Sequence, residues 1–246
     1  MRQFAHVLSA VALLTPFAAS QEDPLQLVKK LAANYTALRS GSYDFEQVEV
    51  REYSGTLQNR TEQRRRIVGS GGKYRDEALP SGPLYMFDGQ YRWAYNPDRN
   101  EYTKAGGVAG LAASLSMFET AAYRAKSARL LRQETLQLDS GPVVCQVIEV
   151  ERERSEDRVQ YSSMTYWIDA SSNLALKLHY KVAVTTSDRP APSESTVTVS
   201  FNRAIVGSPV DESLLRFIPP STPCKWNAYF LGRSPPSLAG IARTSS

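Results

Sequence analysis

Residues 84–95, with the sequence LYMFDGQYRWAY, limit the fold most strongly, because they predict two short strands joined by a tight turn. An Asp-Gly pair between aromatic-rich runs is typical of a β-hairpin, since glycine accepts the positive φ that such a turn needs. With the turn at Asp88-Gly89, one face is wholly apolar or aromatic. It carries Met86 opposite Tyr91, Leu84 opposite Trp93, and Tyr95 beyond them. We interpret this face as the lining of a ligand cavity.

The first residues have the pattern of a secretory signal peptide. Arg2 precedes an apolar run at 7–17, and small residues at 18–20 form a cleavage site before Gln21. The apolar run is too short to span a membrane as a helix, and no cysteine lies at the cleavage site to take a lipid anchor. We therefore expect a signal peptide at 1–20, a single periplasmic domain at 21–224 and a loosely ordered tail at 225–246.

Two segments have the three- and four-residue apolar spacing of amphipathic helices. The first begins at Asp23, a capping residue, and Pro24, which suits the first helical position. The second follows Gly106-Gly107, and these glycines would let it move as a lid; a fixed helix that covers the core is the alternative. The residues that share one face of this second helix are Leu111, Leu115, Phe118 and Ala122.

Most of the remaining chain alternates apolar and polar residues with the period of two that strands have. The apolar side changes face near Glu46-Gln47, which indicates a β-bulge. Residues 174–184 alternate most clearly, with Leu174, Leu176 and Leu178 among those expected on one face. Residues 128–138 fit a helical turn or a strand equally well, and 217–220 are predicted to form a closing edge strand. Strands joined by short turns indicate a large antiparallel meander.

Residues 56–68 carry four arginines, at positions 60, 64, 65 and 66. We interpret this segment as a solvated edge strand whose charges prevent pairing with other chains, in preference to a patch for a partner or a lipid headgroup. The formal charge of the whole chain is +4, which is too small to indicate nucleic-acid binding.

Several individually weak motifs occur in an order that resembles the LolA/LolB superfamily of bacterial lipoprotein carriers. They are Phe45-Glu46-Gln47, Phe87-Asp88-Gly89 with Trp93-Ala94-Tyr95-Asn96-Pro97, Tyr166-Trp167-Ile168-Asp169, and Asp211-Glu212-Ser213 followed by Phe217-Ile218-Pro219-Pro220. The resemblance spans residues 24–222. It implies a mainly β (α+β) fold: one strongly curved antiparallel sheet that forms an unclosed β-barrel, with an N-terminal helix and short lid helices on its concave face. In these carriers the cavity holds the acyl chains of lipoproteins.

The hairpin and the resemblance together name a set of site residues. The candidate cavity residues are Phe45, Leu84, Met86, Tyr91, Trp93, Tyr95, Leu115 and Phe118. The carriers have an Arg-Pro pair before the central hairpin, and its arginine helps to latch the lid. This chain has Tyr74-Arg75-Asp76 there, so Arg75 is the candidate lid latch.

The sequence offers little for catalysis. The mature region has a single histidine, His179, on the polar face of a predicted strand, and there is no G-x-S-x-G motif. Two cysteines and one histidine do not assemble a zinc site of the usual ligands. We therefore expect no enzymatic activity, no cofactor and no metal. An even cysteine count in an oxidising compartment favours a disulfide between Cys145 and Cys224, and two buried free thiols are the alternative.

Two functions of different classes remain. The preferred one is a soluble periplasmic binder or carrier of lipoproteins or other acylated ligands, with transport proteins of the inner or outer membrane as partners. The alternative is a sensor or scaffold of the same fold that binds a protein partner in envelope-stress regulation. We expect a monomer that does not bind nucleic acid.

Overall fold

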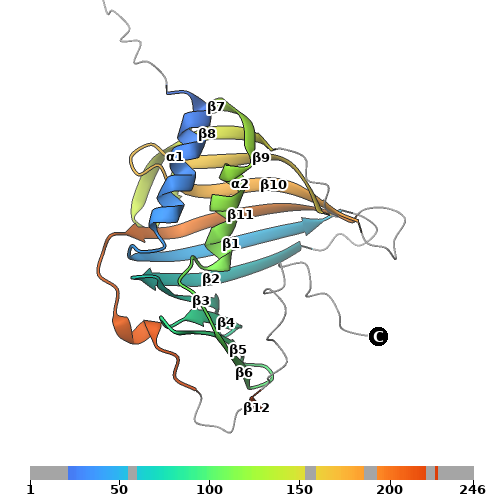
Figure 1. The fold of residues 1–246 in the computed structure, drawn as a ribbon. Helices are drawn as coiled ribbons and strands as arrows, with labels where there is room; N and C mark the ends of the chain where they lie inside the picture. The colour runs from blue at the N-terminus through green and yellow to red at the C-terminus, as the bar shows by residue number, and fades with distance from the viewer. Residues whose placement is uncertain (1–21, 55–59, 153–158, 186–192, 220–224, 227–246) are drawn as a thin grey trace, which may run out of the picture.

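The computed structural model describes residues 22–54, 60–152, 159–185, 193–219 and 225–226. Its strands form one twelve-stranded sheet, and two α-helices lie across one face of that sheet (Figure 1). The strand order is β12-β6-β5-β4-β3-β2-β1-β11-β10-β9-β8-β7, so β12 and β7 are the two edges and the sheet is not closed. The expected fold class, a mainly β protein with one unclosed antiparallel sheet, is confirmed. The predicted signal peptide lies outside the described residues.

The strands from the N-terminal half are β1 (Tyr43–Tyr53), β2 (Arg60–Ser70), β3 (Lys73–Leu79), β4 (Leu84–Phe87), β5 (Tyr91–Asn96) and β6 (Glu101–Gly106). Those from the C-terminal half are β7 (Ala125–Leu138), β8 (Gly141–Arg152), β9 (Val159–Asp169), β10 (Ala175–Val184), β11 (Ser193–Val206) and β12 (Lys225–Trp226). The pair of β12 with β6 is parallel, and β12 extends the sheet beyond the expected domain boundary at residue 224. The turn after β7 reaches back to β11, because the Asp139 amide donates to the Asn202 carbonyl at 2.8 Å.

The two helices begin and pack much as their spacing predicts. Helix α1 (Pro24–Ala37) starts after Asp23, whose carboxylate accepts a hydrogen bond from the Leu25 amide at 3.0 Å. Its apolar stripe is buried against the sheet, and the Tyr35 hydroxyl donates to the Ala175 carbonyl at 2.9 Å. Helix α2 (Ala113–Tyr123) lies beside α1 and buries Leu115 and Phe118. No helix in the described parts of the chain is long and apolar enough to cross a membrane.

The predicted β-bulge is present, because the pairing of β1 with β11 shifts register between Glu46 and Gln47. The prediction of an edge strand at 56–68 is wrong for its described part. Strand β2 is paired on both sides, with β1 and with β3, so its backbone is internal to the sheet. Its arginines are accommodated by carboxylates: Arg65 binds Asp76, and Arg66 binds Asp44.

The central hairpin has the predicted faces but a different register. Leu84 pairs with Tyr95 and Met86 pairs with Trp93, two positions away from the expected pairs. The reason is that Asp88 stays outside the two-residue loop, where its carboxylate accepts bonds from the Gln90 and Tyr91 amides. The loop centre is therefore Gly89-Gln90, and Gly89 has the positive φ of 103°.

Three other expectations are settled by the strands and their neighbours. The ambiguous stretch at 128–138 belongs to β7. The predicted closing strand does not form at 217–219; instead Phe217 packs on the aromatic rings of β5 and β6, as described below. Leu176 does not share a face with Leu178, because the pairing of β10 with β9 shifts at 175–177, and Leu176 joins a small cluster with Cys145 and Trp167.

Of the predicted Cys145–Cys224 disulfide, only the first cysteine lies in the described part of the chain. Cys145 is a buried free thiol on β8, and Cys224 lies outside the described residues. Burial, followed by the nearby charges of Asp169 and Glu134, raises the pKa of the Cys145 thiol to about 12. The thiol is therefore protonated at neutral pH and a poor nucleophile.

Candidate functional site

The sheet has an inner face, which α1 and α2 cover, and an outer face on its other side. Successive residues of β3 show the division, because side chains alternate along a strand. Asp76 faces inward and contacts α2 through Ser114, whereas Arg75 and Glu77 face outward. Residues directly opposite each other on neighbouring strands share a face, so the strand pairs place every side chain of this region on one face or the other.

Three of the eight candidate cavity residues lie together on the inner side. Phe45, Leu115 and Phe118 are at most 1% exposed. The Phe118 ring stacks on Tyr35 of α1 at 5.3 Å between centroids and lies 5.4 Å from Phe201 of β11. The hollow between helices and sheet is thus occupied by side chains of the helices themselves.

The other five candidates lie together on the outer face. They are Leu84, Met86, Tyr91, Trp93 and Tyr95. Their position on this face follows from the strand pairing, because Arg75 lies opposite Met86 and Met86 lies opposite Trp93. The segment after β11 covers part of this row, and Phe217 stacks on Trp93 at 4.6 Å between ring centroids. The row predicted from the hairpin is therefore a real aromatic surface, but it is not on the face that the helices cover.

The candidate latch Arg75 also lies on the outer face, where it forms an ion pair with Glu77 at 2.8 Å. Helix α2 is instead held by the neighbouring residue. The Ser114 hydroxyl donates to Asp76 Oδ2 at 2.7 Å, and Arg65 Nε donates to Asp76 Oδ1 at 2.6 Å. Asp76 and Arg65 are only 2% and 5% exposed. We call Arg65, Asp76 and Ser114 the buried latch.

A second polar contact holds α2 further along its length. Glu119 is 3% exposed and accepts hydrogen bonds from Thr36, in the last turn of α1, at 2.7 Å and from Arg39, just after α1, at 2.8 Å. The start of α2 has no side-chain cap, because residue 112 is alanine. Helix α2 is therefore held by polar bonds at Ser114 and at Glu119, and by the buried apolar side chains of Leu115 and Phe118 between them.

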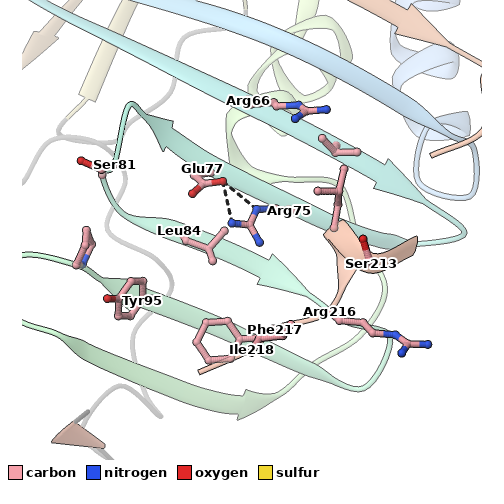
Figure 2. Close-up of a pocket in the computed structure, with 14 residues that line it drawn as sticks. Arg66, Arg75, Glu77, Ser81, Leu84, Tyr95, Ser213, Arg216, Phe217 and Ile218 are labelled. Atoms are coloured by element: carbon pink, nitrogen blue, oxygen red, sulfur yellow. Dashed lines mark hydrogen bonds and ion pairs between the residues drawn. The ribbon is translucent and has the colours of Figure 1, made fainter. Parts of the chain in front are cut away.

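A pocket of about 460 Å³ opens on the outer face, between the sheet and the segment that follows β11 (Figure 2). Strands β2 to β5 form one wall, and η1 (Glu212–Leu215) with the three residues after it forms the other. The lining residues are Arg66, Val68, Arg75, Glu77, Ser81, Gly82, Leu84, Tyr95, Pro97, Ser213, Leu214, Arg216, Phe217 and Ile218. Leu84 and Tyr95, two of the candidate cavity residues, thus line a pocket on the outer face.

Positive charge predominates around this outer pocket. Asp44 binds two guanidinium groups, Arg66 at 3.1 Å and Arg203 at 2.6 Å. Partial burial alone would raise the pKa of Asp44, but the hydrogen bonds from Arg66 and Arg203 outweigh it and lower that pKa. Asp44 therefore stays ionised, and one carboxylate is shared between two arginines.

The sequence reading missed the buried latch, although a signal for it exists. Asp76 lies between Tyr74 and Ala78 on the inward side of β3, and Arg65 lies two residues before the fully buried Ile67 on β2. A charged residue at an apolar position of an alternating strand must find a partner, since burying an unpaired charge is costly. Two such residues of opposite charge on successive strands indicate a buried pair. The third member, Ser114, gives no such signal because serine is common near helix starts.

Comparison with known proteins gives fold similarities only. No protein-family model matches the chain, and no curated protein matches it. A LolA superfamily protein from Nitrosomonas europaea is 10% identical, with a TM-score of 0.32 over 79% of this chain and 98% of that chain. A chain of the MucA/MucB complex from Pseudomonas aeruginosa is 15% identical, with a TM-score of 0.41 over 79% of this chain and 61% of that chain.

LprF from Mycobacterium bovis is 9% identical, with a TM-score of 0.37 over 76% of this chain and 94% of that chain. The superfamily that the sequence motifs resemble is thus among the similar structures. Similarities this low in identity and TM-score carry no weight for the choice of ligand or partner. The function has to be inferred from the residues of this chain.

Proposed function

We propose that the protein is a periplasmic binder of acylated ligands, and that the acyl chain enters the space under α2 when this helix moves away. The observation that carries the proposal is the buried latch. Its members lie on the inner face of β2 and β3 and on α2, and they are 2–6% exposed. A ligand that inserts between α2 and the sheet must break the bond between Ser114 and Asp76.

The energetics of the buried latch allow it to open at low cost. A buried ion pair contributes little net stability, because the cost of removing both charges from water offsets their attraction. Arg65 and Asp76 remain bonded to each other when Ser114 leaves, so the opened state keeps its buried charges paired.

The apolar contacts of α2 limit the affinity for an acyl chain, because the chain must replace them when it enters. An acyl chain gains roughly 0.8 kcal/mol for each buried CH₂ group. Burial of Leu115 and Phe118 under the helix is worth roughly 1.5–3 kcal/mol each, and the ligand forfeits part of it on entry. Because side chains already fill this space in the resting state, binding of the acyl chain is weakened. A carrier needs such weakened binding in order to release its ligand.

The experiment compares Ser114→Ala with Ser116→Ala, two substitutions of the same chemistry on the same helix. Among the described residues, the Ser116 hydroxyl donates only to the Ala113 carbonyl of its own helix, so Ser116→Ala is the matched control. Native mass spectrometry of protein incubated with palmitoylated peptide should show lipid-sized adducts that detergent removes. We expect Ser114→Ala to load faster than wild type, and Ser116→Ala to load at the wild-type rate.

Two results would reject this proposal. One is the absence of any lipid adduct in wild type and in both variants, although the proteins are folded. The other is loading that is unaffected by Ser114→Ala. An apo mass accompanied by a co-purifying protein would favour the alternative, a sensor or scaffold that binds a protein partner.

A further inference from the structure

We infer that the outer pocket is a second binding site, which takes an amphipathic anion: a carboxylate or phosphate group attached to an apolar chain. This site is separate from the space under α2, because its lining comes from the outer face and from the segment 213–218. The inference therefore does not depend on the lid.

The size and shape of the pocket suit a small ligand. Its volume of about 460 Å³ lies within the range of roughly 300–1,000 Å³ that is usual for small-molecule sites. Figure 2 shows Leu84, Tyr95 and Phe217 on one side of the Arg75–Glu77 pair and Arg66 on the other. Ile218 lines the pocket and is 79% exposed, so it adds apolar surface there.

The charged groups of the pocket favour an anion. Three arginines line it and one carboxylate, Glu77, opposes them. Arg66 shares Asp44 with Arg203, so its charge is only partly compensated. Arg216 has no ion-pair partner among the residues that the structure describes, and Arg75 directs both Nε and Nη2 to the same carboxylate oxygen of Glu77. A guanidinium group binds carboxylate and phosphate with paired hydrogen bonds, so these side chains match both headgroups.

Charge also argues against the tail of the chain as the occupant. Residues 227–246 contain two arginines, Arg233 and Arg243, and no acidic side chain. A cationic segment does not complement three arginines, whereas a single-chain anionic amphiphile complements both the arginines and the apolar wall.

The first experiment measures binding of sodium dodecanoate and dodecyl phosphate, below their micelle concentrations, to the full chain by isothermal titration calorimetry. Dodecyl maltoside is the uncharged comparison. We expect at least one of the two anions to bind about tenfold more tightly than the maltoside, and its affinity to fall when salt is raised from about 50 to about 300 mM. Preference between the two anions identifies the headgroup as carboxylate or phosphate.

The second experiment uses the ion pair in the pocket and an equivalent pair elsewhere. Arg75→Gln should weaken anion binding about tenfold, and Glu77→Gln should strengthen it about threefold, because it removes the competing carboxylate. Arg132→Gln is the matched control, since Arg132 pairs with Glu134 two residues along the edge strand β7, and it should change affinity less than twofold. Arg216→Gln should weaken binding a few-fold, because Arg216 lines the pocket and forms no ion pair with the described residues. It replaces Arg75→Gln if that variant does not fold.

Amide chemical shifts locate the ligand and separate this inference from the proposed function. We expect the dodecanoate-induced shifts to centre on β3, β4 and residues 214–218. Shifts centred on α2, equal affinity for anionic and uncharged amphiphiles, or equal effects of Arg75→Gln and Arg132→Gln would overturn the inference and leave the space under α2 as the proposed site. Dodecanoate-induced amide shifts in the outer pocket, together with no effect of Ser114→Ala on the loading of palmitoylated peptide, would reject the proposed function. The outer pocket would then stand as the binding site.

Discussion

Asp76 and Glu77 are adjacent carboxylates on β3 that face opposite sides of the sheet, and they show how the two faces differ. Asp76 is 2% exposed and binds Arg65 and Ser114 beneath α2. Glu77 is partly exposed and binds Arg75 in a solvent-accessible pocket. The inner face is filled by side chains of the helices, whereas the outer face has an open pocket beside residues 213–218. The difference indicates that binding to the inner face needs a conformational change and binding to the outer face does not.

The largest expected difference between the faces comes from one phenylalanine on each. Phe118→Ala removes a fully buried ring beneath α2 and should cost about 3–5 kcal/mol of unfolding free energy. Phe217→Ala removes a partly buried ring from the outer face and should cost about 1–2 kcal/mol, because part of its surface is already in water. Urea denaturation measures both. Equal losses would show that the two faces are packed alike.

The next difference compares the two carboxylates. Asp76→Asn leaves the Arg65 charge buried without an ionised partner and should cost about 3 kcal/mol. Glu77→Gln breaks an ion pair that water reaches and should cost less than about 1 kcal/mol. Both are measured by urea denaturation at neutral pH, and a larger loss for Glu77→Gln would contradict the assignment of faces.

A smaller effect is expected at Asp44, which ties Arg66 of the outer pocket to Arg203. Because its pKa is lowered in the folded protein, Asp44 stabilises the fold at pH values above its unfolded pKa, and this contribution is lost as the pH falls through the folded value. Asp44→Asn should cost about 1 kcal/mol at pH 7, after allowance for solvent exposure, and nothing at pH values below the folded pKa. An unchanged difference between wild type and variant across the acid range would contradict this.

The smallest effect is expected at His179 on β10, whose Nδ1 lies 2.9 Å from the Thr198 hydroxyl. Partial burial, followed by repulsion from Lys177 and Lys181, lowers the pKa of His179. The neutral ring therefore stabilises the fold above the unfolded pKa of about 6.5, and this contribution is lost as the pH falls through the folded pKa. His179→Gln should remove less than about 1 kcal/mol of pH dependence. Thermal unfolding of both proteins between pH 5 and 8 tests this, and identical pH profiles would refute it.

Features that depend on residues close together in the sequence were predicted correctly. The Asp23 cap, the apolar stripe of α1 and the bulge at Glu46-Gln47 are all present, because each depends on neighbouring residues only. The common face of Leu84, Met86, Trp93 and Tyr95 was also correct, since alternation fixes which residues share a face.

The sequence did not show which face of the hairpin the helices cover. Both faces of β4 carry large side chains, with Tyr85 and Phe87 on one and Leu84 and Met86 on the other. Alternation therefore gives no preference, and the choice is made by distant segments: Ser114 of α2 binds Asp76 on the first side of the neighbouring strand β3, and Phe217 packs on Trp93 and Tyr95 on the second. The central place of β2 is equally non-local, because its arginines suggest an exposed edge until Asp44 and Asp76 are brought beside them.

Hydrogen exchange of the amides of α2, compared with those of α1, tests most directly whether α2 is a lid. We expect residues 113–123 to exchange far faster than residues 24–37 in wild type, and the Ser114→Ala substitution to accelerate α2 alone, since opening breaks the bond to Asp76 without unfolding the sheet. Equal protection of the two helices in wild type and in Ser114→Ala would show that α2 is a fixed part of the core and that no ligand enters beneath it.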